Sequence, residues 1–250
     1  MKGSEKKKEN KKENKKKERD MASIYGLYLE EKANSVQIEH ILDLIGPTER
    51  EKIHKLRFEE DIKRSTYAEL MVRYLACTKL GINNQEVHIN YNQYGKPYLS
   101  NNSKVYFNLS HSGKWIICGW STHEIGVDIE QVIEIDIADM EQCLARSEKL
   151  MLESIPVSNR GEMGIELWTL KESYAKYKGL GLYLPLNTFS FELTQPIQYK
   201  GVVEDNLYFY QMYVADDYKL AICCEDRNVT GVELLSLEQI YNTLKENTID

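Results

Sequence analysis

Strands and helices follow one another twice in the same order along this chain, and that order limits the folds it can adopt. Each run begins with a β-branched or aromatic strand, continues through helix-patterned sequence and returns to strands. Such an order predicts an α+β fold made of two comparable halves. Strands are expected at 24–29, 87–91, 105–109, 115–120, 125–130, 189–191, 207–214 and 220–224, and helices at 49–80, 140–153 and 164–178.

The first helical stretch carries recognisable start and stop signals. Thr48 follows Gly46 and Pro47, and Glu51 comes three residues later, which is typical of an N-cap at Thr48. The charged sequence that follows is long enough for two helices, and Gly81 stands where the second is expected to end.

The two halves are expected to meet near residues 122–126, which gives an N-terminal half at 21–123 and a C-terminal half at 124–250. Residues 1–20 differ from both, because they are rich in Lys, Glu and Asn and contain no apolar residue after Met1. Such a segment cannot bury enough surface to offset the entropy lost on ordering. We therefore predict a disordered Lys-rich tail at 1–20.

The charge distribution argues against nucleic acid as a ligand. Residues 1–20 hold ten Lys and Arg against five Asp and Glu, whereas the rest of the chain holds 22 against 34. Nucleic-acid phosphates are bound by clustered cations, and so acidic a body does not favour them.

Other features predict a cytoplasmic protein that does not associate with a membrane. No stretch approaches the roughly 20 apolar residues that span a bilayer, and the charged N-terminus has no apolar segment of a secretory signal. The five cysteines are odd in number and form no C-x-x-C pair, which favours a reducing compartment.

Residues 126–130, Gly-Val-Asp-Ile-Glu, place two carboxylates on one face of a predicted strand. Because side chains alternate, Asp128 and Glu130 lie opposite the aliphatic side chains and roughly 7 Å from each other. Oxygen ligands at that spacing suit one hard cation such as Mg²⁺. The alternative interpretation is an edge strand with a hydrated acidic face.

Residues 168–176, Trp-Thr-Leu-Lys-Glu-Ser-Tyr-Ala-Lys, belong to a predicted amphipathic helix. Leu170 and Tyr174 are part of its apolar stripe, and Glu172 and Lys176 project from roughly the opposite side. This pair is either a surface ion pair or a third metal carboxylate beside a cation that binds phosphate.

Residues 105–113, Val-Tyr-Phe-Asn-Leu-Ser-His-Ser-Gly, run from a strand into a polar turn. Asn, Ser, His and Gly at a strand end offer hydrogen-bond donors and space for a phosphate. The chain contains no G-x-S-x-G, H-E-x-x-H, G-x-x-x-x-G-K-[ST] or G-x-G-x-x-G motif. Serine hydrolases, zincins, P-loop enzymes and Rossmann proteins are therefore not indicated.

Four segments, taken together and in this order, resemble the Sfp-type 4′-phosphopantetheinyl transferases. The resemblance runs from Ile24 to about Phe191 and, more weakly, to the C-terminus. G-x-D-x-E is a weak motif alone, whereas W-x-x-K-E-[SA]-x-x-K is fairly specific. The segments are Gly95-Lys96-Pro97, 107–113, 126–130 and 168–176.

This resemblance implies a monomer of two similar, pseudo-twofold-related α+β halves, with the active site in the cleft between them. The implied enzyme moves the 4′-phosphopantetheine arm of coenzyme A onto a serine of an apo acyl or peptidyl carrier protein, uses Mg²⁺ and releases 3′,5′-ADP. Asp128, Glu130 and Glu172 match the metal carboxylates, and Lys176 matches the lysine that contacts the pyrophosphate.

The resemblance also assigns the remaining contacts to coenzyme A. Ser110 and His111 match a phosphate contact. The other matches are Lys96 and Pro97 on the adenine side, Lys52 and Arg64 at the 3′-phosphate, and Glu148 near the cofactor. In one departure, Glu49 stands where relatives often carry a further lysine, which weakens the expected grip on the 3′-phosphate.

The residue types are compatible with this chemistry. Mg²⁺ and lysine offset charge on the pyrophosphate, and a carboxylate such as Glu172 can take the proton of the attacking serine. Whether Glu172 is ligand, base or both stays open. Two other functions are a non-catalytic carrier-binding homologue and a Mg²⁺-dependent phosphohydrolase that acts on coenzyme A. The intact carboxylates and Lys176 disfavour the first, and the Gly95-Lys96-Pro97 segment disfavours the second.

Overall fold

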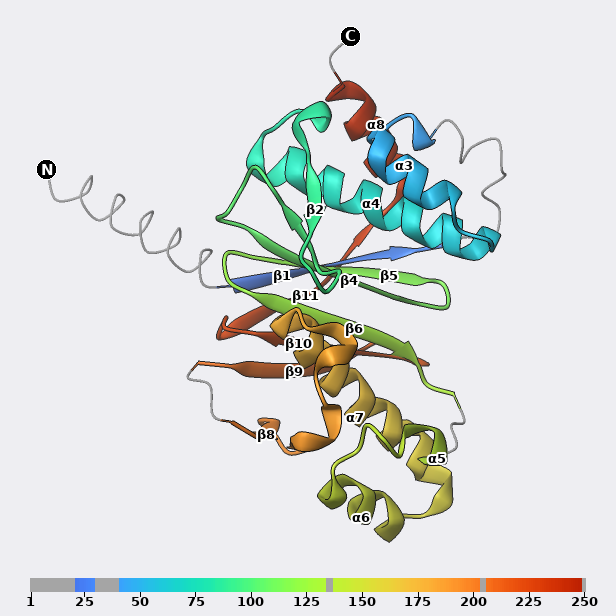
Figure 1. The fold of residues 1–250 in the computed structure, drawn as a ribbon, viewed down its shortest axis with the longest axis vertical. Coiled ribbons are helices and arrows are strands. Elements are labelled where there is room, and N and C mark those ends of the chain that lie inside the picture. Colours follow the sequence, from blue (N-terminus) through green and yellow to red (C-terminus); the bar gives the residue numbers. More distant parts are fainter. Residues whose placement is uncertain (1–20, 30–40, 134–136, 203–205, 249–250) are drawn as a thin grey trace, which may run out of the picture.

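The computed structural model describes residues 21–29, 41–133, 137–202 and 206–248. The tail predicted at 1–20 lies outside these residues. No helix in the described part of the chain is long and apolar enough to cross a membrane. The two α+β halves are stacked along the long axis of the molecule, with their sheets facing each other near the centre and their helices outside (Figure 1).

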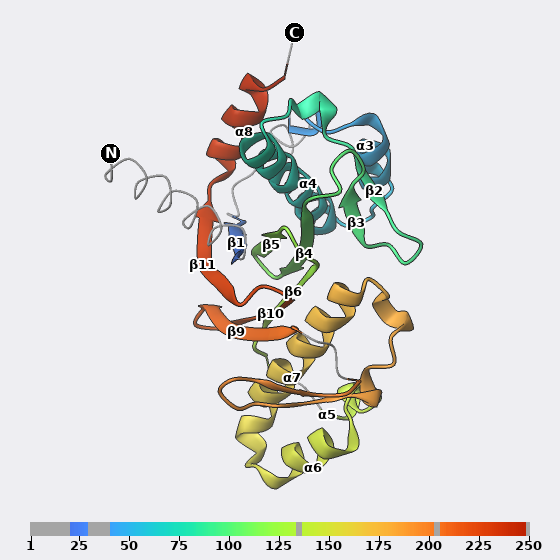
Figure 2. The same ribbon diagram turned by 90° about the vertical axis from the view of Figure 1, so that its left-hand side faces the viewer.

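The first half contains a four-stranded sheet in the order β11-β1-β5-β4. β1 pairs antiparallel with β5 and parallel with β11, so the last strand of the chain lies beside the first. α4 and α8 cover the outer face of this sheet (Figure 2). The bounds are β1 Met21–Tyr28, α3 Pro47–His54, α4 Glu59–Leu80, β2 Ile89–Tyr91, β3 Pro97–Leu99, β4 Tyr106–Ser112, β5 Trp115–Ser121, β11 Asn228–Leu235 and α8 Leu237–Glu246.

The second half contains a three-stranded antiparallel sheet in the order β6-β10-β9. The long helix α7 packs across β6 and β10, and α5 and α6 lie at its far end. A small β7–β8 hairpin completes this half. The bounds are β6 Ile125–Gln131, α5 Ile137–Met140, α6 Arg146–Ser154, α7 Val157–Lys178, β7 Ser190–Glu192, β8 Gln198–Lys200, β9 Tyr208–Ala215 and β10 Tyr218–Cys224.

A shared apolar layer joins the two sheets. Ile24 of β1 and Ile117 of β5 belong to the same buried cluster as Val127 of β6 and Ile222 of β10. Each of these side chains is fully buried, so separating the sheets would return their whole apolar surface to water. This layer fixes β6 against the first half, and β6 carries the two carboxylates singled out from the sequence.

The predicted elements of both halves form, with changes at their ends. Gly46, not Thr48, is the N-cap of α3, because Pro47 already occupies the first helical position. Gly81 ends α4 in the left-handed conformation, as expected. The helix predicted at 140–153 is instead two, α5 and α6, separated by a turn.

Sequence reasoning missed β3, β8, β11 and α8. β11 and α8 come at the end of the sequence, yet they pack on the sheet and helix of the first half. The second half in space therefore ends at β10, whereas the C-terminal half was predicted to run through residue 250. The boundary near residue 123 stays a prediction.

Candidate active site

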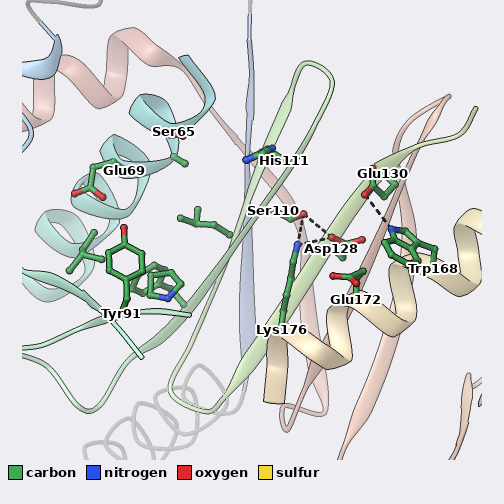
Figure 3. Close-up of a pocket in the computed structure, with 15 residues that line it drawn as sticks. Ser65, Glu69, Tyr91, Ser110, His111, Asp128, Glu130, Trp168, Glu172 and Lys176 are labelled. Atoms are coloured by element: carbon green, nitrogen blue, oxygen red, sulfur yellow. Dashed lines mark hydrogen bonds and ion pairs between the residues drawn. The ribbon is translucent and has the colours of Figure 1, made fainter. Parts of the chain in front are cut away.

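A cavity of about 470 Å³ opens between the two halves, in the position expected for the cleft. Ser65 and Glu69 of α4 and Tyr91 of β2 lie on one side of it (Figure 3). Trp168 and Glu172 of α7 lie on the other side, and β4 and β6 run between them.

The glycine of the 126–130 motif sets how closely α7 approaches β6. A Cβ atom at Gly126 would lie 2.0 Å from the carbonyl oxygen of Ser173 and 2.3 Å from the backbone nitrogen of Tyr177. No residue with a side chain fits there unless the helix moves. Two and four residues further along the strand, Asp128 and Glu130 face the next turns of the same helix. Gly126, Asp128 and Glu130 are therefore spaced two residues apart because all three lie on the face of β6 that runs along α7.

Asp128 is only 3% exposed, and one of its oxygens is left without a partner. Oδ1 accepts hydrogen bonds from Lys176 Nζ at 2.6 Å and from Ser110 Oγ at 3.0 Å. Oδ2 is buried and receives no hydrogen bond. Burial raises the pKa of Asp128, whereas Lys176 and Ser110 act to lower it. The free Oδ2 remains available to a further ligand.

Glu130 is held at both oxygens. Oε2 accepts a hydrogen bond from Ser112 Oγ at 2.9 Å, and Oε1 accepts one from Trp168 Nε1 at 3.4 Å. Burial, followed by the charge of nearby Asp128, raises the pKa of Glu130. The Glu130 side chain is therefore fixed in orientation, but its charged form is disfavoured. A nearby cation would stabilise that charged form.

Glu172 completes the acidic group from the side of α7. Among the described residues, no donor forms a hydrogen bond with its carboxylate. Burial and the charge of Asp128 raise its pKa, and Lys176 acts in the opposite direction. A carboxylate without donors and with a raised pKa is suited to accept a proton or to bind a cation.

The donor set fits a hard cation in its chemistry, because it supplies three carboxylates and an unpartnered buried oxygen. In the described part of the chain, however, no group of three His, Cys, Asp or Glu side chains converges closely enough to hold a metal ion. Lys176 instead supplies the positive charge next to Asp128. Mg²⁺ therefore stays a prediction.

Ser110 is fully occupied by protein groups in this structure. Its hydroxyl donates to Asp128 and accepts from Lys176 Nζ at 2.9 Å and from the backbone N–H of Ile129 at 3.2 Å. One donor and two lone pairs are all that a hydroxyl offers. A phosphate could bind Ser110 only by replacing one of these partners, Lys176 being the most exposed.

His111 stands at the mouth of the cavity, facing α4. Partial removal of its ring from water, followed by the positive charges of Arg64 and Lys176, lowers the pKa of His111. Arg64 forms an ion pair with Asp61 at 2.7 Å and lies close enough to influence His111. Lys52 lies 4.1 Å from the ring centroid of Tyr91, which lines the cavity. Neither Lys52 nor Arg64 lines the cavity itself; these contacts place both beside it, on the side opposite the carboxylates.

Lys96 has its ammonium turned to protein groups that join the halves. It donates to Glu124 at 2.6 Å and to the carbonyl oxygens of Ile125 and Tyr177 at 3.3 and 3.0 Å. Pro97, its neighbour, does line the cavity. A contact between Lys96 and an adenine stays a prediction, and the structure gives Lys96 a role in holding β6 and α7 to the first half.

Glu148 lies away from the cavity, which corrects its expected place near the cofactor. It is 1% exposed and pairs with the fully buried Lys171 at 2.8 Å. Its oxygens also accept the backbone N–H groups of Ala145 at 2.8 Å and Phe191 at 2.9 Å. Glu148 and Lys171 therefore form an internal ion pair that fixes α6 and β7 to α7.

Sequence reasoning missed the contacts that hold the carboxylates in place. Trp168 was part of a quoted motif without an assigned role, and Ser112 was only a polar residue of the turn. Ser112 stands two residues after Ser110 on β4, just as Glu130 stands two residues after Asp128 on β6. That matching period of two was the signal that could have paired them.

The comparisons with known proteins agree with the resemblance. A model of the N-terminal region of 4′-phosphopantetheinyl transferases matches residues 32–122, and a model of the 4′-phosphopantetheinyl transferase superfamily matches residues 124–223. The chain is 33% identical to the 4′-phosphopantetheinyl transferase gsp of Aneurinibacillus migulanus over 193 residues, 76% of this chain and 81% of that protein. It is 30% identical to Sfp of Bacillus subtilis over 203 residues, 80% of this chain and 91% of that protein. The resemblance is confirmed, and the chain belongs to the Sfp-type 4′-phosphopantetheinyl transferases.

Proposed function

We propose that this enzyme transfers the 4′-phosphopantetheine arm of coenzyme A to a serine of an apo acyl or peptidyl carrier protein, with Mg²⁺, and releases 3′,5′-ADP. The observation that carries the proposal is the acidic group of Asp128, Glu130 and Glu172, which meets Lys176 on one wall of an interdomain cavity. Family membership supplies the reaction class.

The two ends of coenzyme A would bind on opposite sides of the cavity. Lys52 and Arg64 are cations on the α4 side and would bind the 3′-phosphate. Lys176 lies on the opposite side and would bind the pyrophosphate, releasing Ser110 and Asp128 as it does so. His111 has its pKa lowered by partial removal from water and by the charges of Arg64 and Lys176. As a neutral ring it can still donate one hydrogen bond to a phosphate oxygen.

Asp128, Glu130 and Glu172 would hold the Mg²⁺, since they are the carboxylates on the β6 and α7 side of the cavity, where Lys176 also lies. When bound, the ion would offset negative charge that grows on the pyrophosphate oxygens. Burial, and after it the negative charge of Asp128, raises the pKa of Glu130 and Glu172, and a bound cation would offset both effects.

The proposed transfer is a displacement at the β-phosphorus of coenzyme A. The carrier serine forms a new P–O bond, and the bond between that phosphorus and the bridging oxygen breaks, so that 3′,5′-ADP leaves with the electron pair. The serine proton would pass to Glu172, which lines the cavity and whose carboxylate accepts no hydrogen bond from a described residue, so that an oxygen is free for the proton. Lys176 stabilises the negative charge that develops on the 5′-phosphate of the leaving 3′,5′-ADP.

A carrier panel tests this proposal against its rivals. The protein is incubated with coenzyme A, Mg²⁺ and several apo carrier proteins, and intact masses are recorded. A carrier that gains one phosphopantetheine supports the transferase. Free phosphopantetheine without a labelled carrier indicates a phosphohydrolase, and carrier binding without either product indicates a non-catalytic homologue.

We further propose that the enzyme acts as a monomer in the cytoplasm. None of the five cysteines, all of which lie in the described residues, forms a disulfide, and four of them are buried, which suits a reducing compartment. Size-exclusion chromatography with light scattering checks the oligomeric state.

A further inference from the structure

The two sheets meet along an edge where backbone groups lack strand partners. β6 is an outer strand, and alternate N–H groups along it point away from β10 toward β4. Buried N–H groups need acceptors, and β4 provides them with side chains instead of its backbone. The bonds run from Val127 N to Asn108 Oδ1 at 2.8 Å, from Ile129 N to Ser110 Oγ at 3.2 Å and from Gln131 N to Ser112 Oγ at 3.2 Å.

We call Asn108, Ser110 and Ser112 of β4 the seam, and they differ in one respect. Each of the two serine hydroxyls also donates a hydrogen bond to a β6 carboxylate. That carboxylate belongs to the residue just before the one whose backbone N–H the hydroxyl accepts. Ser110 thereby bonds Asp128, and Ser112 bonds Glu130. Asn108 bonds only a backbone group, because Gly126 stands in the equivalent place and has no side chain.

The two hydrogen bonds of Ser112 fix the rotamer of Ser112 and the orientation of the Glu130 carboxylate. Its accepted bond ties the oxygen to the β6 backbone, and its donated bond aims the proton at Glu130 Oε2. Trp168 holds the other oxygen of the same carboxylate from α7. The Glu130 carboxylate is thus held by Ser112 of β4 and by Trp168 of α7. Of these two residues, Ser112 also bonds the backbone of β6, the strand that bears Glu130.

We propose that Ser112 is a positioning residue, which holds the Glu130 carboxylate in the orientation needed at the cavity wall. Ser112 does not line the cavity, so it acts through Glu130. The part of this proposal that concerns Mg²⁺ binding rests on the proposed function. The part that concerns the orientation of Glu130 is independent of that function, and the orientation can be measured without metal or substrate.

The indole N–H of Trp168 reports on Glu130 directly. The chain has three tryptophans, so its proton–nitrogen spectrum holds three indole peaks, and Trp168→Phe identifies the relevant one. Ser112→Ala should shift the Trp168 peak, while Ser112→Thr, which keeps the hydroxyl, should restore it. Asn108→Ala removes the hydrogen bond from Val127 N, which is also a seam bond, but Asn108 bonds no carboxylate. This control should therefore leave the Trp168 peak in place. An unmoved Trp168 peak in Ser112→Ala would overturn the proposal.

A second measurement addresses the metal. Removing a residue that orients a metal ligand typically weakens metal affinity by about 10- to 100-fold. Calorimetric titration with Mg²⁺ in the presence of coenzyme A should give that loss for Ser112→Ala and near-normal affinity for Ser112→Thr and Asn108→Ala. At saturating Mg²⁺, carrier labelling by Ser112→Ala should recover most of the wild-type kcat. Equal Mg²⁺ affinities of Ser112→Ala and the wild type would contradict the metal part of the role.

The controls keep the two proposals apart. If the wild type labels no carrier, the proposed function fails, and the indole peak still decides whether Ser112 orients Glu130. Should Ser112→Ala not fold, Ser112→Cys replaces it, because a thiol has nearly the same shape but is a weak donor. Thermal unfolding of every variant confirms that the comparison is between folded proteins.

Discussion

Gly126→Ala should weaken the enzyme in both stability and activity, because the added methyl group meets helix backbone. The Cβ atom would lie 2.0 Å from Ser173 O and 2.3 Å from Tyr177 N, whereas ordinary contacts begin near 3.4 Å. Backbone atoms cannot rotate away as a flexible side chain does. α7 must therefore move off β6 by more than an ångström, and it carries Glu172 and Lys176 with it.

The expected loss follows from overpacking of a closed interface. Such insertions cost about 1–3 kcal/mol of unfolding free energy, and this one should lie at the upper end because both contacts are with backbone. For a protein of this size, a loss at that upper end corresponds to a fall in Tm of about 6–12 °C. Circular dichroism measures Tm, and intact-mass assays of carrier labelling at a temperature where the variant is folded measure kcat.

Gly164→Ala provides a matched control on the same helix. Its Cβ atom would meet only the flexible Met140 side chain, at 3.4 Å. Glycine inside a helix is less favourable than alanine by roughly 0.5–1 kcal/mol, so this variant should gain stability by about that amount. The reasoning is refuted if Gly126→Ala keeps the wild-type Tm and kcat, or if both variants shift in the same direction.

Three further predictions concern charges. Burial raises the pKa of Asp128, Glu130 and Glu172 above their usual values of 3.8 and 4.5, so the folded state binds their protons more tightly. The free energy of unfolding should fall as pH rises above about 4.5, and replacing all three by Asn or Gln should flatten that part of its pH profile; an unchanged slope would count against the shifts. Lys176→Ala should lower kcat, while Arg64→Ala should raise KM for coenzyme A and leave dephospho-coenzyme A almost unaffected; an equal KM penalty on both substrates would show that Arg64 does not bind the 3′-phosphate. Glu148→Ala leaves Lys171 buried and unpaired and should cost about 3–5 kcal/mol in denaturant unfolding, with KM for coenzyme A unchanged in the folded fraction; a higher KM without that destabilisation would favour the role near the cofactor.

The sequence predicted those parts of the fold that depend on local pattern. The alternation of β6 and the apolar stripe of α7 are visible in short windows, and Gly81 ends α4 as expected. β11 was missed although Ser236 caps the following helix, because its place depends on parallel pairing with β1, more than 200 residues away. Nothing local in a chain shows which distant strand it joins.

The site was predictable to the level of residue types, and less so in its contacts. Asp128, Glu130, Glu172 and Lys176 line one cavity, as the motifs indicated. The family resemblance gave Glu148 a place near the cofactor, although its partner Lys171, three positions after Trp168, stands on the buried face of α7. Which face a charged residue occupies on an amphipathic helix depends on tertiary burial, and that information came only from the structure.

The most direct test of the account is the mass of an apo carrier protein after incubation with coenzyme A, Mg²⁺ and either the wild type or Asp128→Ala. Asp128 contributes its carboxylate to the cavity wall beside Lys176, so its removal should eliminate the proposed metal and pyrophosphate arrangement. The account predicts that the wild type adds one phosphopantetheine to the carrier, and that the folded Asp128→Ala protein adds none within the same time. A wild type that leaves every carrier unmodified, or an Asp128→Ala protein that labels carriers at the wild-type rate in saturating Mg²⁺, would contradict it.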